Sequence, residues 1–131
     1  MRIRMNMRSV ITLLSAVFFI AILPMPGDAL TPGEAFDAAV AYREAVRINP
    51  EDASAWNNLG GALYDLKRYN DAIDAYRHAL WINPEFAEAW FNLGVAYAFV
   101  GNRTAAINAV QELRRLDPAM ADKLFNWLVP H

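Results

Sequence analysis

Residues 53–86 read ASAWNNLGGALYDLKRYNDAIDAYRHALWINPEF, and residues 87–120 read AEAWFNLGVAYAFVGNRTAAINAVQELRRLDPAM. The two stretches have the same length of 34 residues and align from end to end without a gap. A fixed spacing of this length predicts supersecondary units that stack on one another. The alignment pairs Trp56 with Trp90, Asn58 with Asn92, Leu59 with Leu93, Gly60 with Gly94, Ala62 with Ala96, Ala72 with Ala106, Ile73 with Ile107 and Pro84 with Pro118.

The order of the repeated residues is Trp-x-x-Leu-Gly, then Ala, then Pro. At a period of 34 residues this order resembles the tetratricopeptide repeat (TPR). Two departures are visible: Leu63 occupies the usual aromatic slot, with Tyr64 one place later, and Val110 and Leu113 replace the aromatic and the small residue of the last second helix. The resemblance implies an all-α solenoid of antiparallel helical hairpins, with ligands in a concave groove lined by the first helix of each hairpin.

A half repeat precedes the two full repeats. Residues 31–50 match the second helix of a repeat, but residues 19–32, which would form its first helix, contain three prolines and a glycine. Proline in a helix interior costs about 3 kcal/mol, so this first helix is not expected. Thr31 and Glu34, with Pro32 between them, fit a capping box, and we therefore expect a helix to begin here.

A terminal helix follows the second full repeat. Within residues 119–128, the pattern places Leu124, Trp127 and Leu128 on one side, as in a helix that covers the last repeat. Together with the half repeat (31–50) and the two full repeats, this predicts one domain over residues 30–131. Its helices are expected at residues 31–48, 53–66, 70–82, 87–100, 103–116 and 119–128.

The repeated residue types predict how these helices pack. Gly60 and Gly94 have no Cβ, so a neighbouring helix can approach them closely, where a larger residue would overpack the contact. Large aromatic side chains, among them Trp56, Tyr76 and Trp90, are expected to fill the space between helices. The prolines at the ends of the repeats fix the turns, because proline cannot continue the preceding helix.

The N-terminal segment has the layout of a secretory signal. Residues 1–8 contain three arginines, residues 10–23 are almost entirely apolar, and prolines follow. A helix of that apolar length would span about 21 Å, short of the ~30 Å hydrocarbon core, so a membrane anchor is the less favoured interpretation. Small residues at Gly27 and Ala29 predict cleavage before Leu30. The sequence thus predicts residues 1–29 as a signal peptide and a periplasmic or secreted protein, in contact with a membrane only if the segment is retained.

Composition disfavours several classes of function. After residues 1–29 are set aside, 9 of the 12 basic and 13 of the 14 acidic residues remain, a net charge of −4 without a basic stripe, so a nucleic-acid partner is not expected. The chain has no cysteine. Neither His78 nor His131 has a carboxylate at metal-ligand spacing, and Ser54 lies where serine caps a helix. We therefore expect no enzyme activity, no cofactor and no metal.

The resemblance also implies where a partner binds. When this chain is aligned with the family pattern, none of the positions that would line the groove is Lys or Arg. Binding of a C-terminal carboxylate by basic residues is therefore not expected. Asn58 and Asn92 recur outside the packing pattern and could bind the backbone of an extended peptide, although they also fit ordinary surface positions. The predicted groove residues are Asn57, Asn58, Gly61, Tyr64 and Asp65 from the first full repeat, and Glu88, Phe91, Asn92, Val95 and Phe99 from the second.

The function predicted from these features is that of an exported scaffold or adaptor that binds a peptide or a partner protein. Two alternatives remain open at this stage. The first is a structural protein that self-associates through the uncovered apolar face of helix 31–48, giving a homo-oligomer. The second is a regulatory subunit of an envelope enzyme, for which the sequence offers no supporting constellation of residues.

Overall fold

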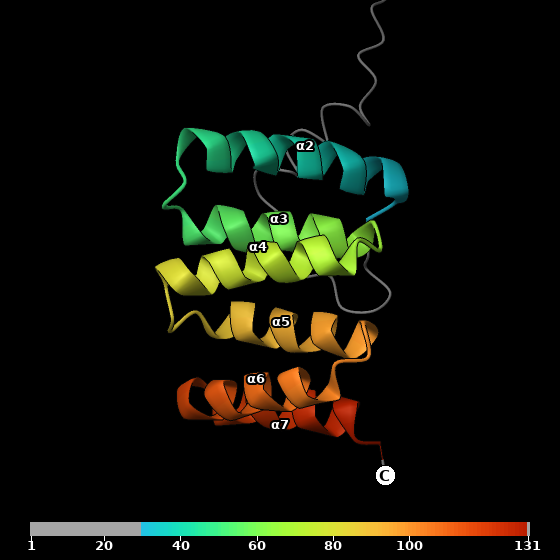
Figure 1. Cartoon of the computed structure of the whole chain (residues 1–131), viewed down its shortest axis with the longest axis vertical. Helices are drawn as coiled ribbons and strands as arrows, with labels where there is room; N and C mark the ends of the chain where they lie inside the picture. The colour runs from blue at the N-terminus through green and yellow to red at the C-terminus, as the bar shows by residue number, and fades with distance from the viewer. Residues whose placement is uncertain (1–29, 131) are drawn as a thin grey trace, which may run out of the picture.

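The computed structural model describes residues 30–130 of the chain. This part contains six α-helices and no strand, and the helices stack in chain order along the long axis of the molecule (Figure 1). The predicted all-α fold is therefore confirmed, and each helix ends within one residue of its predicted limits. The helices are α2 (Pro32–Ile48), α3 (Ala53–Asp65), α4 (Tyr69–Ile82), α5 (Ala87–Phe99), α6 (Arg103–Leu116) and α7 (Pro118–Leu128). The predicted signal segment, residues 1–29, lies outside the described residues.

Polar side chains cap the beginnings of most helices. The capping box at α2 is present: the Glu34 amide donates to Thr31 Oγ1 (3.3 Å), and the Thr31 amide donates to the Glu34 carboxylate (3.4 Å). The prediction for Ser54 was wrong, because Asp52 caps α3 by accepting a hydrogen bond from the Ala55 amide. Ser54, two residues after this cap, lies inside the helix and is exposed.

In the first full repeat, α3 and α4 approach each other closely at Gly60, as the pattern predicts. A Cβ built on Gly60 would lie 2.6 Å from Cδ1 and 2.9 Å from Cζ of Tyr76, closer than real side chains approach. Tyr76 on α4 is only 1% exposed, so its ring has no free space to move into. The absence of a side chain at Gly60 therefore sets the distance between α3 and α4.

The second full repeat uses its glycine differently. A Cβ on Gly94 would lie 2.7 Å from Cδ2 of Leu124, a fully buried residue of α7. Leu124 also belongs to a cluster with Val110 and Leu113 of α6, which stand where the sequence departs from the repeat pattern. The terminal helix thus packs against the two positions that depart from the repeat pattern, and it covers this repeat as predicted.

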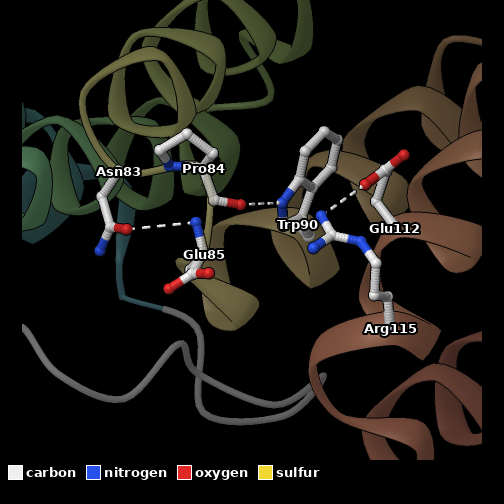
Figure 2. A network of polar contacts seen from close by, with 6 residues as sticks. All are labelled: Asn83, Pro84, Glu85, Trp90, Glu112 and Arg115. Carbon is white, nitrogen blue, oxygen red and sulfur yellow. Dashed lines mark hydrogen bonds and ion pairs between the residues drawn. The ribbon is translucent and has the colours of Figure 1, made fainter.

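Each repeat tryptophan also binds the turn that precedes its helix. Trp56 Nε1 donates to the Pro50 carbonyl, and Trp90 Nε1 donates to the Pro84 carbonyl, both at 2.8 Å. Figure 2 shows the second of these bonds. Both indole rings are only partly buried, whereas the sequence pattern suggests that they fill the interior. A tryptophan here joins two successive units through a hydrogen bond as well as through packing.

This bond predicts a measurable cost for removing the indole N–H. We expect Trp90→Phe to lower the free energy of unfolding by about 0.5–1.5 kcal/mol, because the ring is largely kept and the hydrogen bond is lost. Urea unfolding checks the value. Trp81→Phe is the matched control, since Trp81 is 77% exposed; equal effects of both substitutions would contradict a stabilising role for the bond.

Candidate partner-binding face

The predicted binding residues lie on α3 and α5, the first helices of the two full hairpins. These helices contact each other, and α5 also contacts α7. We call the surface formed by α3, α5 and α7 the first-helix face. A surface hollow elsewhere, on α6, is lined by Arg103, Thr104, Ile107 and Asn108 and contains none of the predicted residues.

Three polar side chains meet where α3 packs against α5. Asn92 Nδ2 donates to Asn57 Oδ1 at 3.0 Å, and Asn57 Nδ2 donates to Glu88 Oε1 at 3.4 Å. Glu88 and Asn92 are four residues apart on α5 and therefore project from the same side of that helix. The two asparagines are 3% and 2% exposed, so this polar chain lies almost entirely beneath the surface.

The Glu88 carboxylate determines which groups of Asn57 and Asn92 donate hydrogen bonds and which accept them. An ionised Glu88 can only accept hydrogen bonds, so the Asn57 amide must turn its NH₂ group toward it. Asn57 Oδ1 then accepts from Asn92, and the remaining oxygen, Asn92 Oδ1, has no partner among residues 30–130 although it is buried. A buried acceptor without a donor is uncommon, because leaving it unpaired costs about 1–3 kcal/mol.

Burial corrects the sequence-based interpretation of the recurring asparagines. We predicted that Asn58 and Asn92 play equivalent roles on an open surface. Asn92 is instead buried, and the residue that pairs with it is Asn57, whereas Asn58 is half-buried on α3. The alignment places Asn57 opposite Phe91, so the two repeats supply different residues to this contact.

A row of aromatic rings lies at the other end of α3 and α5. Phe99 packs edge-on against Tyr64 (ring centroids 5.4 Å apart) and stacks with Tyr69 (4.9 Å) and Trp127 (6.0 Å). Phe99 is 48% and Trp127 47% exposed. These four rings, here called the aromatic row, come from four different helices and present apolar surface to solvent.

The row includes two residues that sequence reasoning missed. Trp127 was expected to pack with Leu124 and Leu128, but only Leu124 is fully buried, and Trp127 stacks on Phe99. Tyr69, at the start of α4, had no signal in the repeat pattern. Both residues join the row because the ends of α3, α5 and α7 and the start of α4 meet there.

The remaining predicted residues support the face. Phe91 and Val95 are half-buried and pack against the cluster of α6 and α7, which leaves them partly accessible. Gly61 is buried. We find no unusual contact for these three residues that would by itself indicate a ligand.

Asp65, at the end of α3, is in a poorly solvated position. Burial raises its pKa from 3.8 to about 6, although a hydrogen bond from the Leu30 backbone N–H opposes the shift. Burial also raises the pKa of Tyr64 and of Tyr76, and the nearby charge of Asp65 adds to both shifts. The Asp65 charge therefore disfavours ionisation of both tyrosine hydroxyls.

The pKa of Asp65 predicts a pH dependence of stability. Between about pH 4 and pH 6 the folded state binds more protons at this residue than the unfolded state, so its contribution to stability falls as pH rises through about 6. We expect Asp65→Asn to remove this loss. Melting temperatures at pH 4.5 and pH 7 should show a larger advantage of the variant at pH 7, while Asp37→Asn, at an exposed site on α2, controls for the lost charge. An advantage that is the same at both pH values would contradict the assignment.

The described residues contain no group of three or more His, Asp or Glu side chains that could hold a metal ion. His78 is exposed, as predicted, and its ring stacks on Trp56 with centroids 4.3 Å apart.

Across residues 30–130, no helix combines the length and apolar character needed to cross a membrane.

Solved structures similar to this chain share its fold. The TPR2B domain of yeast Sti1, determined as a complex with pHsp70, is 21% identical, with 94% of this chain and 97% of that chain covered and a TM-score of 0.72. The TPR2AB domain of yeast Sti1, in complex with pHSP90, is 20% identical, with coverage of 94% and 47% and a TM-score of 0.72. MamA is 24% identical, with coverage of 73% and 67% and a TM-score of 0.64.

Family models account for the repeats. A search of curated proteins gave no match. A model described as TPR repeat matches residues 27–67 and 62–101, and a model described as tetratricopeptide repeat matches residues 87–120. Because these matches cover more than half of the sequence, the chain belongs to the tetratricopeptide-repeat family.

Proposed function

We propose that this protein is a non-catalytic adaptor that binds a segment of a partner protein across the first-helix face. The observation that carries the proposal is the aromatic row, in which Phe99 and Trp127 stack on each other although 48% and 47% of their surfaces remain exposed. The exposed rings of Phe99 and Trp127 offer apolar contacts of the kind that anchor partners.

Relatives support the class of function. Two similar structures are domains of yeast Sti1 in complexes with pHsp70 and pHSP90, so this fold holds protein ligands in those cases. The ten predicted positions of the present chain include no Lys or Arg. We therefore expect the partner segment to bind through its apolar side chains, and a free C-terminal carboxylate is not required.

Site-specific photo-crosslinking tests the location of the face. A benzophenone amino acid at position 99 should crosslink to the partner in native cells, whereas the same residue at position 81 on α4 should not. Both native residues are exposed aromatics, so the two sites are matched. Mass spectrometry identifies the captured protein, and calorimetric titration with that purified protein then measures affinity.

We expect Phe99→Ala to weaken this binding by about 1 kcal/mol or more, because exposed aromatic residues at an interface centre are frequent hot spots. Arg77→Ala, an exposed change on α4, should leave the affinity nearly unchanged. If Arg77 proved critical and Phe99 silent, the opposite face of the solenoid would be the binding surface and the present proposal would fail.

We also propose that the protein acts outside the cytoplasm. The support is the arginine-rich start and the apolar run at residues 10–23, followed by small residues at Gly27 and Ala29. The expected exported product begins at Leu30. Intact-mass measurement of the exported form decides this, and a mass that retains residues 1–29 in a membrane pellet would show an anchor instead.

A second candidate function is self-assembly through α2. Phe36 is 61% and Val40 53% exposed, one helical turn apart. The equivalent positions of α4 are Asn70 and Asp74, both polar, so the apolar pair is peculiar to α2. Sedimentation velocity should then show a dimer of the wild-type protein that Val40→Asp abolishes; a monomer at every accessible concentration would exclude this candidate.

A further inference from the structure

Basic residues are unevenly distributed over the described helices. Residues 30–130 contain nine Lys and Arg side chains, and none of them lies on α3 or α5. They belong to α2, α4, α6 and α7 and to the turn between α3 and α4. The helices α3 and α5 instead carry two carboxylates, Asp65 and Glu88, both half-buried. The part of the first-helix face that α3 and α5 form is therefore negatively charged.

Asp65 adjoins the aromatic row. It follows Tyr64 at the end of α3, and the period of 34 residues makes it the equivalent of Phe99 at the end of α5. The rings of Tyr64 and Phe99 pack edge to face with centroids 5.4 Å apart, so the ends of the two helices lie side by side. A carboxylate in the first full repeat thus takes the position that an exposed aromatic ring takes in the second.

No cation within the described part of the chain neutralises this carboxylate. None of the four ion pairs among residues 30–130 includes Asp65. Lys67 and Arg68 follow it in the turn, but Arg68 pairs with Asp71 at 2.7 Å and Lys67 is exposed. A half-buried carboxylate is poorly solvated, so it attracts a cation from a binding partner more strongly than a fully exposed carboxylate does.

Carboxylate and aromatic rings together suit a cationic side chain. We propose that the partner segment carries a lysine or arginine whose charged group binds Asp65 while its methylene groups pack on the aromatic row. Lysine and arginine combine an apolar stem with a charged end, and aromatic rings attract cations through their faces. The inference rests on the adaptor function proposed above and specifies the chemistry of the partner. The charge of this site is opposite to that of a site for a C-terminal carboxylate.

Peptide display tests the charge preference. Phages that carry short random peptides are selected on the full chain and on the Asp65→Lys variant, whose circular dichroism spectrum verifies that it folds. On the native protein we expect enrichment of Lys and Arg next to aromatic or aliphatic residues, and on Asp65→Lys we expect that enrichment to disappear. Selected peptides without enriched basic residues would overturn this inference and leave the adaptor function standing. If the native protein selected no peptide at all, the adaptor function would fail as well.

A double-mutant cycle then locates the cation. The most enriched peptide, and a version with norleucine in place of its basic residue, are titrated calorimetrically against the native protein, Asp65→Asn and Asp37→Asn. Asp65→Asn should weaken binding of the basic peptide about tenfold and change binding of the norleucine peptide little.

Asp37→Asn, which removes an exposed charge on α2, is the matched control and should change both affinities by less than about threefold. Equal losses from Asp65→Asn and Asp37→Asn would overturn the proposal, because the attraction would then reflect the net charge of the chain. A loss from Asp65→Asn that is the same for both peptides would also overturn it, since the basic residue would then not bind at Asp65.

Discussion

Gly60→Leu is expected to lower the free energy of unfolding by about 3 kcal/mol and the melting temperature by more than about 10 °C. A Cβ alone at this position would approach Tyr76 Cδ1 to 2.6 Å, and a leucine adds three further carbon atoms. Tyr76 is fully buried, so the ring cannot turn away without opening the contact between α3 and α4. Thermal and urea unfolding, followed by circular dichroism, measure both quantities.

A glycine elsewhere on a helix provides the control. No atom lies within 4 Å of a Cβ built on Gly33, so Gly33→Ala should be neutral or stabilise the protein by about 0.4–1 kcal/mol. Gly60→Ala combined with Tyr76→Leu should recover part of the stability that Gly60→Ala loses. If Gly60→Leu melted like the wild type, the assigned packing of the two helices would be incorrect.

Asn57→Ala has the second-largest expected effect, a loss of about 1–3 kcal/mol in the free energy of unfolding. The substitution removes the acceptor for Asn92 Nδ2 and leaves both polar groups of that buried side chain unpaired. Asn92→Ala should cost less, because it removes the unpaired oxygen together with the hydrogen bond. Urea unfolding of both variants tests this order.

A double-mutant cycle separates the contact from the individual residues. The double variant Asn57→Ala/Asn92→Ala should lose less stability than the sum of the single variants, since neither side chain then leaves a buried partner unsatisfied. Asn58→Ala, at a half-buried neighbouring position, should change stability only slightly. Equal losses for Asn57→Ala and Asn58→Ala would mean that the buried pair is not a significant stabilising contact.

Much of the fold follows from local sequence features. Prolines end the repeats because they cannot continue a helix, and Thr31 with Glu34 starts α2 through a capping box that the structure contains. The spacing of Gly60 in the repeat also identifies a close helix contact correctly. These features can be predicted from the sequence because each depends on backbone chemistry or on residue size at one position.

The complete aromatic row could not be predicted from the sequence. Tyr64 and Phe99 were predicted for the binding face, but Tyr69 and Trp127 were not. Their rings meet because four helix ends lie close together in the fold. The repeat pattern carries no information about the distances between those ends.

The sequence by itself determined the repeat period, the helices and the family, because the pattern of glycine, proline and large residues recurs at a fixed spacing. Only the tertiary structure decided which asparagine faces a partner helix. Adjacent helical residues differ by about 100° in direction, so Asn57 and Asn58 point to different surroundings although they are neighbours in the chain. The rotation of α3 against α5, fixed by packing along both helices, buries Asn57 against Asn92 and leaves Asn58 half-buried.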